Sequence, residues 1–312
     1  MNTKYSAIAR FLGWPTQKKA GIALIASLLL ALTPAELLAH PEIEEQIARL
    51  TLALEKEPKN ANLWLRRSDL QRQHRQFDLA FADLAQVARL KPGWPALYLA
   101  RARTFFDAQR PQDALDAAEE FLKLEPTHAE GLLLRARCWT KLGQMNKATA
   151  GYTEALRRFA EPPPDLFLEH ARLQAALGRF DEALQGLDEA ILKLGPAPAL
   201  EFATIEYEQQ RGDFQAALRR ATALVSRAEI KEPALALKAE LLEQTGHLAE
   251  AREAFQRVLA GIVAYPANRR SIDATLQLQG RAQDGLARVQ GKISGSLHGK
   301  GCSVASRPDA TQ

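Results

Sequence analysis

The sequence predicts an all-α protein built as a stack of helical repeats. An alanine recurs every 34 or 35 residues, at Ala80, Ala114, Ala148, Ala183, Ala217 and Ala251. A glycine stands five residues before each of the last four alanines, at Gly143, Gly178, Gly212 and Gly246. Apolar residues recur at helical spacing between these positions, and no segment has the alternating pattern of a strand. Repetition with this period is typical of helix pairs that stack on one another.

Residues 1–39 predict an export signal. Two lysines precede an apolar run at residues 21–32, and the segment ends at Ala39. The run is too short to span a bilayer, which takes about 20 residues, but it suits a signal peptide. No cysteine lies near Ala39 to mark a lipoprotein. We therefore expect an exported chain, periplasmic in a bacterium, with no membrane span once mature. A signal that stays uncleaved as an anchor is the alternative.

Residues 40–60 predict an N-terminal capping helix, and residues 61–260 predict six units in register. The first unit carries a tryptophan, a small residue, an aromatic residue, an alanine and a proline, at Trp64, Ser68, Phe77, Ala80 and Pro92. Later units repeat most of these residues. The recurring glycines are expected to end each first helix in a left-handed conformation. Where a proline follows the second helix, it is expected to end that helix.

This pattern resembles the tetratricopeptide repeat family. The resemblance implies a right-handed α-solenoid of about six tetratricopeptide helix-turn-helix repeats, with the first helix of each unit lining a concave face. Glu201 and Glu208 replace apolar residues in the fifth unit, which we expect to pack less tightly than its neighbours. The units lie near residues 61–94, 95–128, 129–162, 164–197, 198–231 and 232–260.

The C-terminal region predicts one more helix and a tail. Residues 261–290 contain apolar residues in partial helical phase, which indicates a C-terminal capping helix. Gly280 and Gly285 each weaken such a helix by up to about 1 kcal/mol. Residues 291–312 are rich in glycine, serine and lysine and have no periodicity. We expect this tail to be disordered.

The chain carries none of the motifs of phosphate-binding, hydrolytic or zinc enzymes. Its six histidines are scattered, and Cys138 and Cys302 lack metal-ligand spacing, so we expect one buried and one exposed thiol. Outside residues 1–39 the basic and acidic residues nearly balance, which argues against a nucleic-acid partner. The sequence therefore predicts no enzyme activity, no cofactor and no metal site.

Two columns of residues predict a peptide-binding groove on the first helices. One column is apolar, and a second column four residues further along includes Arg103, Arg137 and Arg172. Because a spacing of four places both columns on one helix face, they could bind an extended peptide with acidic groups. The alternative is that Arg103 and Arg137 pair internally with Asp69, Asp107 and neighbouring acids. With Phe106 added, the predicted site is Leu65, Leu99, Arg103, Phe106, Leu133, Arg137, Leu168, Arg172 and Phe202.

These features predict a non-enzymatic scaffold or assembly factor of the cell envelope, which binds a protein or peptide partner. One alternative is a copper carrier or enzyme subunit, because cleavage after Ala39 would place His40 at the N-terminus, where its amine and imidazole could chelate copper. Another alternative is a self-assembling structural element, whose chains would pair through the solenoid ends or the C-terminal helix. That alternative predicts an oligomer that is lost when residues 262–312 are removed.

Overall fold

The computed structural model describes residues 41–300, except for the side chains of Pro41 and of residues 296–300. The predicted signal peptide, His40, Cys302 and the end of the predicted tail lie outside the described residues. The described chain contains no strand, which confirms the all-α class. None of its helices is both long enough and apolar enough to span a bilayer. Residues 41–110 and 111–300 form two compact parts, and each is described by itself.

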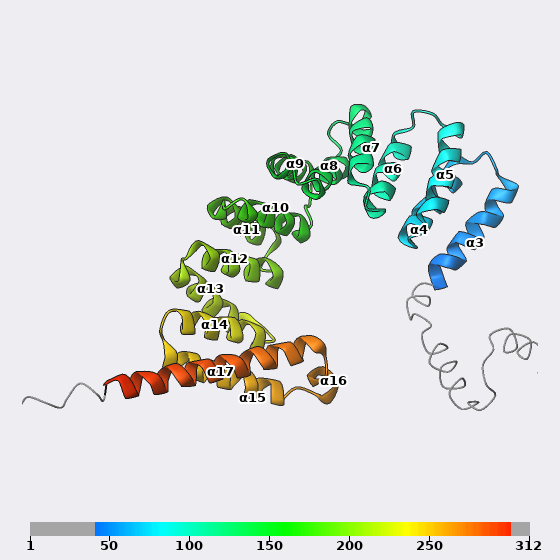
Figure 1. Ribbon diagram of the computed structural model, residues 1–312. Coiled ribbons are helices and arrows are strands. Elements are labelled where there is room, and N and C mark those ends of the chain that lie inside the picture. The colour runs from blue at the N-terminus through cyan, green and yellow to red at the C-terminus, as the bar shows by residue number, and fades with distance from the viewer. Residues whose placement is uncertain (1–40, 301–312) are drawn as a thin grey trace, which may run out of the picture. The chain divides into compact units, whose positions relative to one another are not determined.

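The first part contains four helices: α3 (Pro41–Lys56), α4 (Ala61–Gln73), α5 (Phe77–Leu90) and α6 (Pro95–Asp107) (Figure 1). Helix α3 packs against α4, α4 packs against α5, and α6 packs against both α4 and α5. Leu84, Val87 and Leu97 form the buried core of this part, with Trp64 and Leu65 packed against them. The side chain of Asn60 caps α4 by accepting a hydrogen bond from the N–H of Asn62.

The second part continues the same arrangement of paired helices. Each helix from α7 to α14 packs against the next one along the chain. The helices of both parts fall two to each predicted unit, and all six repeated alanines are fully buried. Pro111 begins α7, where a proline is tolerated because the first N–H of a helix has no partner within it. The helices are α7 (Pro111–Leu124), α8 (Ala129–Lys141), α9 (Met145–Arg158), α10 (Pro164–Ala176), α11 (Phe180–Leu194), α12 (Pro198–Arg211), α13 (Phe214–Arg227), α14 (Glu232–Gln244), α15 (Leu248–Val263), α16 (Ala267–Arg270) and α17 (Asp273–Lys300).

The turn between the two helices of a unit has the left-handed residue that the glycines predict. Gly143 has a φ of 73°, and the N–H of Gln144 donates to the carbonyl of Trp139 at 2.9 Å. This bond from the residue after the turn closes the end of the first helix. The first two units make the same turn without glycine, because Arg75 and Gln109 adopt φ values of 60° and 57°.

The fifth unit buries its two acidic residues as paired groups. Glu208 is 3% exposed and accepts a hydrogen bond from Arg220 at 2.6 Å, and Glu201, 7% exposed, is paired with Arg227. Burial raises the pKa of Glu208, and Arg220 partly offsets this effect. Ile205 is fully buried beside them. Pairing with arginines therefore lets two acidic residues occupy buried positions in this unit.

The C-terminal helix is longer than the sequence predicts. Helix α17 packs against α15 and α14 and extends to Lys300, past the predicted end at residue 290, so residues 291–300 are helical and not a tail. Val289 is fully buried and Ile293 packs against the same apolar cluster. A Cβ on Gly285 would lie 2.3 Å from Cζ of Phe255. The glycine that weakens the helix is thus the residue that lets α17 approach α15.

Candidate binding grooves

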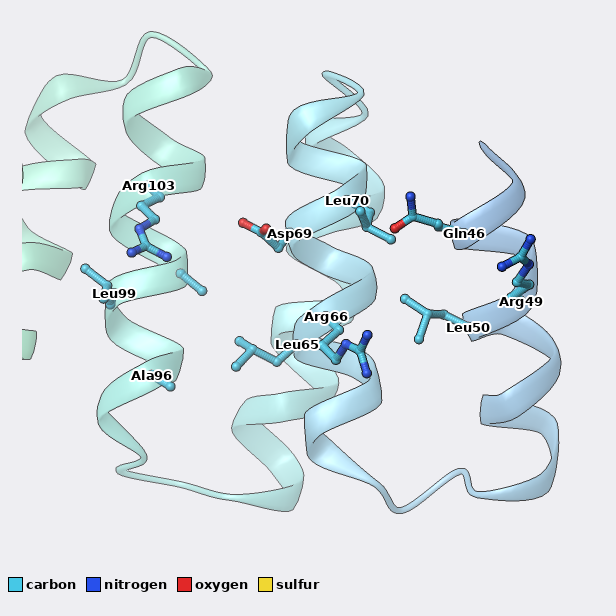
Figure 2. Close-up of a pocket in the computed structure, with 11 residues that line it drawn as sticks. Gln46, Arg49, Leu50, Leu65, Arg66, Asp69, Leu70, Ala96, Leu99 and Arg103 are labelled. Atoms are coloured by element: carbon cyan, nitrogen blue, oxygen red, sulfur yellow. The ribbon is translucent and has the colours of Figure 1, made fainter. Parts of the chain in front are cut away.

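The first part has a groove with a volume of about 610 Å³ along α3, α4 and α6, here called the α3–α4–α6 groove. Leu50, Leu65 and Leu99 contribute apolar surface to it. Figure 2 shows Leu65 directed from α4 towards α6, and Leu50 directed from α3 towards α4. The charged side chains that line it are Arg49, Arg66, Asp69 and Arg103.

The one carboxylate of this groove is already bound. Arg72 donates to Oδ1 of Asp69 at 2.7 Å, and Gln73 donates to Oδ2 at 2.7 Å. Arg72 also binds Asp107. Asp69 and Asp107, two of the acids expected near Arg103, thus both pair with Arg72.

The cations of this groove differ in their surroundings. Arg49 pairs with Glu45 at 2.5 Å, but both side chains are largely exposed, which makes such a pair weak. Arg66 is exposed and has no ion-pair partner among residues 41–300. Arg103 is half-buried and makes further interactions of its own. Arg66 therefore adds a positive charge to this groove beside the exposed pair of Arg49 and Glu45.

The second part has a comparable groove of about 600 Å³ along α10 and α12, here called the α10–α12 groove. Leu168, Phe202 and Tyr207 line it together with one cation, Arg172, and one anion, Glu206. Burial raises the pKa of the Tyr207 hydroxyl, with a contribution from Glu206, and Arg172 partly offsets it. This groove combines apolar side chains with one charge of each sign.

Six of the nine predicted site residues line these two grooves. Leu65, Leu99 and Arg103 lie in the first, and Leu168, Arg172 and Phe202 lie in the second. The remaining three, Leu133, Arg137 and Phe106, line neither groove. Leu133 is 6% exposed, and Phe106 is half-buried.

Arg137 is held within the protein. It donates two hydrogen bonds to Glu169, at 2.9 and 2.7 Å, and the hydroxyl of Tyr152 donates to the same carboxylate at 2.9 Å. Because Glu169 accepts two hydrogen bonds from the guanidinium of Arg137, this arginine is less available to a ligand. The pairing of Arg137 with Glu169 thus follows the internal alternative, in which neighbouring acids neutralise this arginine.

The grooves also contain three residues that the sequence does not predict as site residues: Arg49, Arg66 and Tyr207. Arg66 follows the predicted Leu65 directly, and Arg49 lies on the capping helix, which was not counted among the units. No group of three or more metal-binding side chains occurs in the described part of the chain. Cys138 is buried, and burial raises the pKa of its thiol to about 12.

Comparisons with known proteins agree with this architecture. A family model described as the tetratricopeptide repeat matches residues 99–161 and 202–269. No curated protein sequence matches the chain. Among solved structures, the C-terminal part of a TPR repeat-containing protein from Cytophaga hutchinsonii is 13% identical, with a TM-score of 0.56 over 72% of this chain and 95% of that one.

Two further structures are similar. PilW, a widely conserved type IV pilus biogenesis factor, is 17% identical, with a TM-score of 0.51 over 66% of this chain and 94% of its own. A tetratricopeptide repeat protein from Parabacteroides merdae is 17% identical, with a TM-score of 0.49 over 78% and 93% of the two chains. At these identities the likeness concerns the fold.

Proposed function

Because the chain is a tetratricopeptide repeat protein, we propose that it is a non-enzymatic scaffold or assembly factor of the cell envelope that binds extended polypeptide segments along its first helices. Proteins of this fold are generally protein-interaction scaffolds. The observation that carries the proposal is the α10–α12 groove, where an apolar row lies beside Arg172 and Glu206. An extended chain places alternate side chains on one face, so it can fill apolar positions and reach the charged ones. The predicted export signal supports the envelope as the location.

The test is site-specific photo-crosslinking in the envelope fraction of the native host. A photoreactive residue replaces Ala203, which lines the α10–α12 groove. The control position is Leu192 on α11, which is 86% exposed and lies outside the groove. We expect one reproducible partner from position 203, lost when Phe202 is changed to Asp, and none from position 192. Equal capture from both positions would contradict the proposal.

A further inference from the structure

Helix α3 corresponds to the second helix of a unit whose first helix is not among residues 41–300. It lies one repeat before α5, so Arg49 and Leu50 occupy the positions of Asp83 and Leu84. In α5 these two residues belong to the helix that packs against α4, and they are 3% and 1% exposed. In α3 the Arg49 side chain is 70% exposed and Leu50 is only half-buried. Within residues 41–300, the face of α3 that a first helix would cover is therefore open.

At the repeat position of Arg49, two of the six units carry a charged residue that pairs with the first helix, and the other four carry alanine or glycine. Asp83 accepts two hydrogen bonds from Arg67 of α4, both at 2.7 Å. Arg220, at the same position in the fifth unit, donates to Glu208 of α12 at 2.6 Å. A first helix covering α3 would therefore present an acid to Arg49.

Arg66 on α4 has the same relation to a preceding first helix. Its equivalent on α10 is Glu169, which binds Arg137 of the preceding first helix α8. Leu70 corresponds to Leu173, which is 5% exposed, whereas Leu70 is half-buried. Figure 2 shows Arg66 and Leu70 directed from α4 towards α3. The open surface thus continues from α3 onto α4.

We propose that this surface, formed by Arg49, Leu50, Arg66 and Leu70, binds an acidic amphipathic helix of a protein partner, which takes the place of the first helix paired with α3. Its acids face the two arginines and its apolar residues cover the two leucines. The chain's own sequence is a poor match, because Pro34 lies one repeat before Ser68 and a proline inside a helix costs about 3 kcal/mol. The proposal rests on the proposed protein-binding function but uses a surface separate from the α10–α12 groove.

The probe is a helix-stabilised synthetic peptide with the sequence of α12, Pro198–Arg211. In the fold, Glu208 of this helix binds Arg220, which stands at the repeat position of Arg49. Glu206 stands at the repeat position of Arg137. The partner of Arg137 is Glu169, which stands at the repeat position of Arg66. Fluorescence anisotropy measures its binding to the full chain purified from the native host. We expect binding that weakens about tenfold when both glutamates are changed to Gln.

Protein variants supply the matched controls. Arg49→Glu and Arg66→Glu should each weaken peptide binding about tenfold, whereas Arg89→Glu, an equal change of charge on an exposed residue of α5, should leave it unchanged. A peptide with Glu208→Lys should regain binding to the Arg49→Glu protein. Failure of this charge exchange, or equal binding of the Gln peptide, would overturn the proposal.

Two other results are informative. If the chain binds vesicles of phosphatidylglycerol in an Arg66-dependent manner and not the peptide, these arginines face a membrane surface and the proposal is wrong. If the peptide does not bind while position 203 still captures its partner, only this inference fails. Loss of capture at position 203 would contradict the proposed function instead.

Discussion

Gln109 and Arg75 hold left-handed backbone conformations at the turn where later units have glycine. A non-glycine residue in this conformation is strained by about 1–2 kcal/mol because its Cβ crowds the following carbonyl. Gln109 has a φ of 57° and an exposed side chain. Neither packing nor backbone preference therefore explains why residue 109 is a glutamine.

We expect Gln109→Gly to stabilise the protein by about 0.5–1 kcal/mol, since the relief of strain exceeds the entropic cost of glycine. The matched control is Gln256→Gly, at an exposed position inside α15, which should destabilise by about 1 kcal/mol. Urea unfolding midpoints measure both changes. A lower midpoint for the Gln109 variant would contradict the strain argument.

The pair of Arg137 and Glu169 predicts a measurable coupling. Both side chains are about one-third exposed, at 36% and 31%, and two hydrogen bonds join them. A double-mutant cycle with alanine at each position should give a coupling free energy of about 1 kcal/mol. A coupling near zero would instead leave Arg137 available for a ligand.

At the scale of the helix, α17 is positioned by a close approach and by ion pairs. Gly285 faces Phe255, whereas a Cβ on Gly280 would meet nothing within 4 Å. Gly285→Ala should therefore lower the stability of α17 by about 1–3 kcal/mol, because the helix must move away from α15. Gly280→Ala should raise its stability by about 1 kcal/mol. Hydrogen exchange of α17 amides distinguishes the two, and similar effects of both would contradict the packing.

Glu243 makes the docking of α17 depend on pH. Burial alone would raise its pKa, but hydrogen bonds from Arg288 and Lys292 of α17 outweigh burial and lower it below the ordinary value of 4.5. A carboxylate with a lowered pKa stabilises the fold above the ordinary value, and this contribution is lost as the pH falls through the lowered pKa.

We therefore expect proteolysis of α17 to become faster as the pH falls below about 4.5. Glu243→Gln should remove most of this pH dependence, because the amide cannot titrate. The comparison needs an acid-active protease, and Glu240→Gln is the control, since Glu240 pairs with Arg281 of the same helix but is more exposed. An unchanged pH dependence in the Glu243 variant would disprove the assignment.

The whole chain shows which features a repeat makes predictable. The helix pairs could be predicted because each repeated alanine, such as Ala148, marks a close helix contact that tolerates no larger residue. The turn at Gln109 could be placed only from its register, since glutamine carries no signal for a left-handed conformation. The sequence predicts too early an end for α17, because residues 291–300 are rich in glycine, serine and lysine and only the structure shows Ile293 packed against the apolar cluster.

The binding surfaces, like the helices, could be predicted only in part from the sequence. The columns with Leu168 and Arg172 follow from the resemblance and line a groove. Arg137 differs because its partner, Glu169, stands outside both columns, in the next unit. A binding role for Arg49 and Arg66 can be inferred only once α3 is known to be a second helix with an open face.

A repeat protein buries a continuous core, so its last unit needs a cap. Helix α17 supplies that cap, because Phe255, Val258 and Ile262 of α15 are buried in the cluster that α17 completes. A chain that ends at Ser271 should therefore expose this apolar face and self-associate, as light scattering would show. Arg281→Ala, which removes only the exposed pair with Glu240, should behave as the full chain does.

The self-assembly alternative makes the opposite prediction, since it expects removal of residues 262–312 to abolish an oligomer. An oligomeric full chain that becomes monomeric without α17 would favour that alternative and contradict the role of α17 as a cap.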